Sequence, residues 1–386
     1  MRFNTLKNAF LILCMLFFTG NILHAADSNN EESSLPTSIY TGLQGKYHVQ
    51  GIAIDKEKGH IYFSFTTRLI KMDLKGNFIG SVEGLTGHLG CLTRNPVDGR
   101  IYGSLEYKND AIGKGIAGEK AEKRDNAFYI VIFDPDKITR PNMSAEKDGV
   151  MTSVYLKEVV DDFEATVIHK GEEIKHRYGC AGIDGVTFAP EVGKKDGKML
   201  LYVSYGIYND LKRTDNDYQV MRAYDTSKWS KYENPLSQEN MHKQGPAKSK
   251  DLYFVYTGNT DWGIQNLAYD PATGNMLAAV YKGKKKEFPN FAFFMFDWSK
   301  PAKKMQLKGY DGKMIQKTIP LASQGIYDEK TGTYGWHFKF GVTGLCPLGN
   351  GYFYISHSNS KPQQSCTAKL YKWTGAPDGP FQLVTE

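Results

Sequence analysis

Cysteine is scarce in this chain of 386 residues, which contains five. The four cysteines beyond Cys14 are spaced too widely for a small disulfide scaffold or for a zinc motif built from close cysteine pairs. Cys91 and Cys346 lie within apolar runs, which predicts that both are buried. Cys180 and Cys366 are predicted to lie in loops, either as two free thiols or as a disulfide pair.

Long hydrophobic runs are missing after residue 26, and no later segment reaches the roughly 20 apolar residues that a transmembrane helix needs. The N-terminus itself carries basic residues, then an apolar stretch over residues 9–23 and the small pair Ala25-Ala26. This pattern predicts a secretory signal peptide over residues 1–26. We therefore expect the mature protein to be exported, to the periplasm or the extracellular space.

A strong excess of one charge is also missing, because the formal net charge is only +6 at pH 7. The one run of three basic residues, Lys284-Lys285-Lys286, is interpreted as a solvated loop, so nucleic acid is not an expected partner. Residues 27–35 are polar and predict a disordered leader. Residues 36–386 are expected to form a single domain.

The sequence does contain an internal repeat. Residues 47–67 and 87–107 align so that His48 matches His88. Each has an apolar strand, a turn rich in Asp, Asn, Gly or Pro, and a second strand, which predicts a β-hairpin. Three further segments follow the same pattern: 182–205, 263–281 and 341–358.

A second motif, a strand ending in a turn, follows each hairpin. Five units of four short strands predict an all-β fold, a β-propeller of five four-stranded antiparallel blades. A sixth blade formed by residues 304–338 and a β-sandwich with long loops are the alternatives. The corner of the second motif carries residues that we interpret as turn formers: Asp73, Asp134, Asp225 and Asp297, with Lys372 in the fifth copy.

Long insertions are predicted on one face of the propeller only, which indicates a binding surface there. Closing the ring removes exposed sheet edges, so residues 38–43 are expected to pair with the C-terminal blade. The insertions lie between the second and third strands at 107–126, 206–217, 282–290 and 358–367, and before inner strands at 161–180, 230–250 and 322–338.

The aligned inner hairpins also bring polar residues to the mouth of the central channel: His48, Gln50, His88, Glu106, Asp184 and Gln265. A metal site is one interpretation, with His48, His88, Asp184 and Glu106 as ligands. Carboxylates and carbonyls would favour Ca²⁺ there, and two histidine ligands would favour Zn²⁺ or Mn²⁺. The alternative is a pair of channel-lining histidines held by backbone carbonyls.

A pair of carboxylates is the second interpretation, because glycoside hydrolysis uses two carboxyl groups that face each other across the scissile bond. Asp184 and Glu106 form the best pair, from adjacent blades. The alternative is that Asp184, within Gly-Ile-Asp-Gly, satisfies backbone amides.

Proton abstraction is the third interpretation. His88 or His48 would act as the base, Arg68 or Lys339 would neutralise a substrate carboxylate, and Tyr205 or Tyr208 would be the acid. Non-catalytic binding is the fourth, with Trp262 and Tyr208 stacking on a sugar and Gln50 and Gln265 providing hydrogen bonds. No GxSxG or HExxH motif is present.

Residues 50–77, with the pattern QGIAID, GHIYFS and LIKMDLKGN, resemble the secreted propellers of the broad NHL, gluconolactonase and phytase-like group. The resemblance implies a propeller, and its gluconolactonase branch implies acidic metal ligands at the channel mouth. Gln50 stands at the corresponding position of the first blade, so lactonase activity is not carried over. The sequence predicts an exported propeller that binds a carbohydrate or sugar acid, with metal-assisted hydrolysis or elimination as an extension and a non-catalytic scaffold as the alternative.

Overall fold

The computed structural model describes residues 35–121 and 124–385. The predicted signal peptide lies outside the described residues, and so does nearly all of the predicted leader. Residues from Thr37 onward form one compact unit. Among the described residues, no helix is both long and apolar enough to span a membrane.

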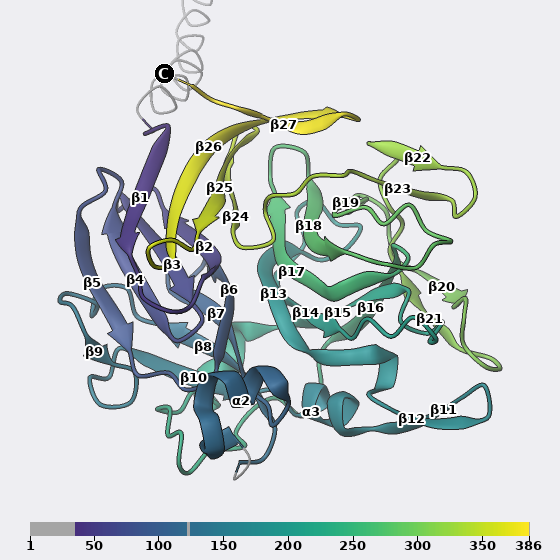
Figure 1. Cartoon of the computed structure of the whole chain (residues 1–386), viewed down its shortest axis with the longest axis horizontal. Coiled ribbons are helices and arrows are strands. Elements are labelled where there is room, and N and C mark those ends of the chain that lie inside the picture. The colour runs from purple at the N-terminus through teal and green to yellow at the C-terminus, as the bar shows by residue number, and fades with distance from the viewer. Residues whose placement is uncertain (1–34, 122–123, 386) are drawn as a thin grey trace, which may run out of the picture. The chain divides into compact units, whose positions relative to one another are not determined.

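The strands form a five-bladed β-propeller, as the repeats predict (Figure 1). The inner strands of neighbouring blades contact one another in a closed ring of β2, β6, β13, β17 and β24. Blade 1 consists of β2 (Val49–Asp55), β3 (His60–Phe65), β4 (Arg68–Asp73) and β5 (Phe78–Glu83), and blade 2 of β6 (His88–Arg94), β7 (Ile101–Tyr107), β8 (Ala127–Phe133) and β10 (Met151–Tyr155).

The other three blades follow in chain order, each antiparallel from its inner strand outward. Blade 3 consists of β13 (Cys180–Pro190), β14 (Met199–Ile207), β15 (Tyr218–Tyr224) and β16 (Asp251–Tyr256), blade 4 of β17 (Thr260–Asp270), β18 (Asn275–Lys282) and β19 (Phe293–Phe296), and blade 5 of β24 (Leu345–Gly349), β25 (Tyr352–Asn359), β26 (Ser365–Ala376) and β1 (Ser38–Leu43).

The ring closes through the N-terminal strand, which confirms the pairing predicted for residues 38–43. Strand β1 pairs antiparallel with β26, with Ile39 opposite Ala368, so the last blade contains both ends of the unit. The final strand β27 (Gly379–Leu383) also pairs with β26. Closure of this kind leaves fewer sheet edges exposed for unwanted pairing.

The alternative of a sixth blade in residues 304–338 is wrong. Strands β20 (Lys303–Gln306) and β21 (Ile315–Thr318) extend blade 3, where β21 pairs parallel with β16. Strands β22 (Ile326–Asp328) and β23 (Thr333–Gly335) form a separate hairpin beside β19. Blade 4 has no regular fourth strand among the described residues, where only the isolated bridges Phe293–Trp336 and Phe296–Leu321 continue the sheet.

The prediction that the insertion at 230–250 precedes an inner strand is wrong. It joins β15 to β16, the third and fourth strands of blade 3, and it crosses to the outer edge of blade 2. There Ser153 and Asn234 form an antiparallel bridge, and the Tyr155 N–H donates to the Gln244 carbonyl. The shorter strands β9 (Met143–Ser144), β11 (Thr166–His169) and β12 (Glu172–Lys175) lie in other insertions.

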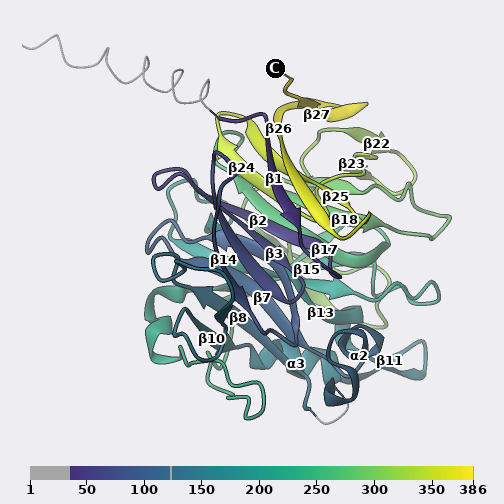
Figure 2. The same cartoon turned by 60° about the vertical axis from the view of Figure 1, so that its left-hand side comes forward.

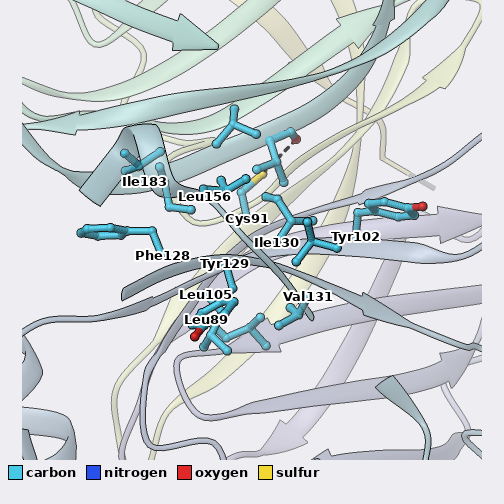
Figure 3. Close-up of a cluster of buried hydrophobic side chains, with 14 of the residues drawn as sticks. Leu89, Cys91, Tyr102, Leu105, Phe128, Tyr129, Ile130, Val131, Leu156 and Ile183 are labelled. Atoms are coloured by element: carbon cyan, nitrogen blue, oxygen red, sulfur yellow. Dashed lines mark hydrogen bonds between the residues drawn. The ribbon is translucent and has the colours of Figure 1, made fainter. Parts of the chain in front are cut away.

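The core between the blades is built from apolar inner strands. Leu89 and Leu105 face each other across β6 and β7, and Ile130 and Ile183 lie nearby, all fully or almost fully buried (Figure 3). Burial of one such side chain stabilises the folded state by about 1.5–3 kcal/mol. Contacts of this kind hold adjacent blades together and make the inner strands rigid supports.

All four described cysteines are free and buried. The prediction is confirmed for Cys91 and Cys346, where burial raises the pKa of the thiols to about 11 and about 12. The loop prediction is wrong for Cys180 and Cys366, which lie in β13 and β26. Both strands are longer than their apolar pattern indicates, because the sheet pairing continues into polar segments.

Candidate functional site

A cavity of about 350 Å³ lies at the mouth of the central channel. Blades 1 to 4 and helix α2 (Ala111–Ala117) form its walls. Helices α2 and α3 (Lys157–Glu164) lie at the same end of the strands (Figure 2). The residues that line the cavity are Tyr47, His48, Gln50, Thr66, His88, Glu106, Lys108, Ala111, Ile112, Gly115, Ile116, Ala181, Ile183, Asp184, Gly206, Trp262, Gln265 and Tyr281.

The candidate residues from the aligned hairpins lie together in this cavity. Equivalent positions in neighbouring blades share one distance from the propeller axis, so the repeat brings them to a common rim. Their functional roles stay predictions. The seven predicted residues that line the cavity are His48, Gln50, His88, Glu106, Asp184, Trp262 and Gln265.

Three other candidates do not line the cavity. Arg68 forms an ion pair with Glu83, with 3.2 Å between Nε and Oε2. Lys339 lies over the ring of Phe340, 5.0 Å from its centroid. Tyr208 lies behind the cavity wall, where its ring meets Trp262 edge-on. These residues come from strand ends and loops outside the aligned columns, so the repeat gives no information on where their side chains point.

Glu106 and Lys108 form a buried ion pair in the cavity wall. The Lys108 Nζ lies 2.7 Å from Glu106 Oε1 and also donates to the Ala181 carbonyl at 2.8 Å. Burial lowers the pKa of Lys108, but the carboxylates of Glu106 and Asp110 outweigh it and raise that pKa above its ordinary value. Burial raises the pKa of Glu106, and Lys108 opposes that shift. We therefore assign an ionised pair.

Both oxygens of Glu106 are committed to the protein. Oε2 accepts the N–H of Ile183 at 3.1 Å, and a Cβ on Gly182 would come within 2.0 Å of it. Glycine at residue 182 is thus required by the close approach of this carboxylate. Glu106 is consequently better placed to orient its neighbours than to attack a ligand.

His88 lies against the same carboxylate, with 3.6 Å between its Nδ1 and Glu106 Oε1. This distance is too long for a hydrogen bond, and Nδ1 has no other partner among the described residues. Burial, assisted by the charge of Lys108, lowers the pKa of His88 to about 3. The imidazole is therefore neutral at physiological pH.

Asp184 presents the second carboxyl group. Burial raises its pKa well above the ordinary value, and the charge of Glu106 adds to that shift. The side chain is 7% exposed, and Oδ1 has no hydrogen-bond partner among the described residues. A buried polar atom without a partner is costly, so Asp184 is an unusual feature of the cavity wall.

Blade 1 adds a set of uncharged polar groups. The Gln50 amide nitrogen lies 3.1 Å from Nε2 of His48 and donates to Thr66 Oγ1 at 3.2 Å. Burial lowers the pKa of His48, which favours its neutral form. These contacts fix the orientation of three side chains toward the cavity.

An aromatic wall comes from blade 4. Trp262 has a positive φ of 64°, which is uncommon for a bulky residue and indicates that its surroundings hold it there. The amide of Gln265 donates to the Trp262 carbonyl at 3.0 Å. Burial raises the pKa of Tyr281 to about 12, so its hydroxyl keeps its proton.

Two contributors to the site were missed from the sequence, Lys108 and helix α2. The helix begins at its cap Asp110, whose carboxylate accepts the Gly113 N–H at 2.9 Å and the Tyr208 hydroxyl at 3.1 Å. The Tyr47 hydroxyl donates to the Gly115 carbonyl at 3.3 Å. The signals available were the spacing of Glu106 and Lys108 on one strand face and Asp110 as an N-cap.

Metal binding by His48, His88, Asp184 and Glu106 is a prediction from the sequence. Among the described residues, no group of three or more His, Cys, Asp or Glu side chains is arranged to hold a metal ion. The Lys108 ammonium lies beside Glu106, where a cation would be expected, and the two charges balance. Metal binding stays a prediction, and we derive no chemistry through a metal.

No family model matches this chain, and no curated protein matches its sequence. Solved structures that resemble it are β-propeller proteins. A glucose dehydrogenase is 11% identical, with 86% of this chain and 99% of that chain covered and a TM-score of 0.36. The pyranose dehydrogenase PQQ domain from Coprinopsis cinerea is 10% identical, with 83% and 81% covered and a TM-score of 0.37.

A luciferin-regenerating enzyme is also similar, at 11% identity, with 91% of this chain and 100% of that chain covered and a TM-score of 0.35. These similarities carry no argument about the ligand of this chain, which depends on the cavity itself.

Proposed function

We propose that this protein binds a carbohydrate in the cavity at the channel mouth. The observation that carries the proposal is a cavity of about 350 Å³ whose lining combines polar side chains with Trp262 and Tyr281. Cavities of about 300–1,000 Å³ with a few convergent polar groups are typical of small-molecule sites. Sugars combine hydroxyl groups with an apolar ring face, which matches the polar groups of blades 1 to 3 and the aromatic wall of blade 4.

We also propose that the protein acts after export, in the periplasm or outside the cell. The N-terminal pattern over residues 1–26 supports this location. The resemblance of residues 50–77 to the NHL, gluconolactonase and phytase-like group agrees with an exported propeller. The narrower membership stays a prediction because Gln50 replaces the expected acidic residue.

The test is calorimetric titration of the mature chain with neutral monosaccharides, comparing two variants. Trp262→Ala removes part of the aromatic wall and should weaken binding about fivefold or more, since such an anchor contributes about 1 kcal/mol or more. Lys339→Ala lies outside the cavity and is the matched control, for which no change is expected. Equal affinity of both variants would show that the ligand binds elsewhere.

Hydrolysis of a glycosidic bond is a second candidate function, favoured by the raised pKa of Asp184. Asp184 would give its proton to the leaving-group oxygen, a water would supply the hydroxyl to the sugar carbon, and neutral His88 would take the proton from that water. Chromogenic glycosides test this activity. Asp184→Asn should abolish turnover and retain binding, whereas turnover at the parental rate would remove Asp184 from the chemistry.

A further inference from the structure

We infer that the ligand is an uncharged sugar of about one ring, and that the cavity discriminates against sugar acids. This inference rests on the proposed function, because it names the class of carbohydrate that the same cavity takes. It departs from the sequence-based expectation that either a carbohydrate or a sugar acid would bind.

The charge of the cavity lining is the first evidence for an uncharged ligand. Lys108 is the only lysine or arginine among the described residues that line the cavity. Its ammonium contacts Glu106 at 2.7 Å, the Ala181 carbonyl at 2.8 Å and Asp110 at 3.6 Å. Glu106 and Ala181 accept two of its three donor hydrogens, and the Asp110 carboxylate lies within ion-pair distance. The charge of Lys108 is therefore balanced by carboxylates of the protein.

The basic side chains that the sequence predicts as partners of a ligand carboxylate lie outside the cavity. Arg68 is paired with Glu83 and donates to the Gln44 amide oxygen, away from the cavity. Lys339 lies over Phe340. Lys284, in the basic run 284–286, is paired with Asp261 at 2.9 Å. A carboxylate in the cavity would therefore be desolvated without a cationic partner, which strongly disfavours binding.

The third step is the balance of hydrogen-bond donors and acceptors. Burial lowers the pKa of His88 to about 3 and raises the pKa of Asp184 well above its ordinary value, so burial favours the uncharged form of both groups. Gln50 and Gln265 also line the cavity, and their amide nitrogens donate to protein acceptors. Hydroxyl groups satisfy such a mixture because each is both donor and acceptor, whereas a carboxylate only accepts.

The fourth step is size. A cavity of about 350 Å³ lies at the lower end of the range for ligand sites, and Ile112 and Ile116 of α2 cover one side. The space suits one ring with short substituents. Trp262 and Tyr281 contribute aromatic surface to the lining, which suits the apolar side of such a ring.

The test is calorimetric titration with matched pairs that differ only at C6: glucose and glucuronate, galactose and galacturonate, mannose and mannuronate. At least one neutral sugar should bind about tenfold or more tightly than its acid, since an unpaired buried carboxylate is disfavoured by at least that factor. Its affinity should not change between about 50 and 500 mM salt, because no charge pair forms.

Two variants add a cation to the lining. Gln265→Lys should shift the preference toward the acid of the same pair. Tyr47→Lys should have the same effect and replaces the first variant in the test if Gln265→Lys fails to fold. Lys339→Ala should leave both affinities unchanged. Acids that bind the parent chain as tightly as neutral sugars would overturn the inference but leave the proposed function standing. Binding of neither class would overturn both.

Discussion

The Nζ of Lys108 lies 2.7 Å from Oε1 of Glu106, two residues back along the chain, and both side chains are buried in the wall of the cavity. Residues two apart on a strand point to the same side, so the end of β7 delivers both groups to one place. The pair places a full positive and a full negative charge next to the ligand cavity while leaving the cavity nearly neutral.

This ion pair predicts a strong coupling between its members. Lys108→Met should lower the free energy of unfolding by about 3–5 kcal/mol, because it leaves the Glu106 carboxylate buried without its partner. The double variant Lys108→Met with Glu106→Gln should be more stable than Lys108→Met alone, since both charges are then gone. Urea denaturation followed by circular dichroism measures the stability of the parent, of each single variant (Lys108→Met and Glu106→Gln) and of the double variant. Strictly additive losses would contradict the assignment of an ionised pair.

The raised pKa of Asp184 predicts that the free energy of unfolding falls as pH rises. As pH rises from about 4, near the ordinary carboxyl pKa, the unfolded chain releases a proton that folded Asp184 keeps. The free energy of unfolding should therefore fall over this range more steeply in the parent than in Asp184→Asn. Urea denaturation at pH 4 and pH 7 tests the difference.

Asp73→Asn is the control for this pH dependence, with the opposite sign. The side chain of Asn77 donates to Asp73 and lowers its pKa, so the stability that Asp73 contributes is present at neutral pH and lost as pH falls below about 4. Parallel pH profiles for the parent and Asp184→Asn would show that Asp184 titrates normally.

Helix α2 contains two glycines that should respond differently to alanine. A Cβ on Gly113 would lie 1.6 Å from the Lys108 carbonyl oxygen, so Gly113→Ala should displace α2, lower the melting temperature and weaken sugar binding. A Cβ on Gly115 meets nothing within 4 Å, so Gly115→Ala should stabilise the helix by up to about 1 kcal/mol. Thermal denaturation distinguishes them, and equal effects would mean that α2 does not pack as described.

Because β1 closes the ring, replacing its buried residue Ile39 should lower the free energy of unfolding far more than replacing its exposed neighbour Tyr40. Ile39 is 2% exposed, and Ile39→Ala should lower the free energy of unfolding by about 2–5 kcal/mol. Tyr40 is 52% exposed, and Tyr40→Ala should change it by less than about 0.5 kcal/mol. Similar losses in the two variants, measured by urea denaturation, would indicate that β1 is not docked on β26 in solution.

The sequence by itself determined the blade count and the residues at the channel mouth. Each hairpin repeats the same alternation of apolar and polar residues, and side chains alternate across a strand with a period of two. Equivalent positions such as His48 and His88 must therefore lie at equivalent depths around the axis. The predicted pairing of residues 38–43 follows from the same geometry, because a closed ring needs a partner for its last sheet.

Only the tertiary structure decided which groups act together in the cavity. Insertions carry no repeat, so their paths depend on packing, which brought Lys108 and α2 into the site and left Arg68 and Lys339 outside it. Charge states depend on burial and on neighbours from other blades, as with Asp184 beside Glu106. The neutral character of the cavity arises from contacts between residues far apart in the chain, which no local pattern encodes.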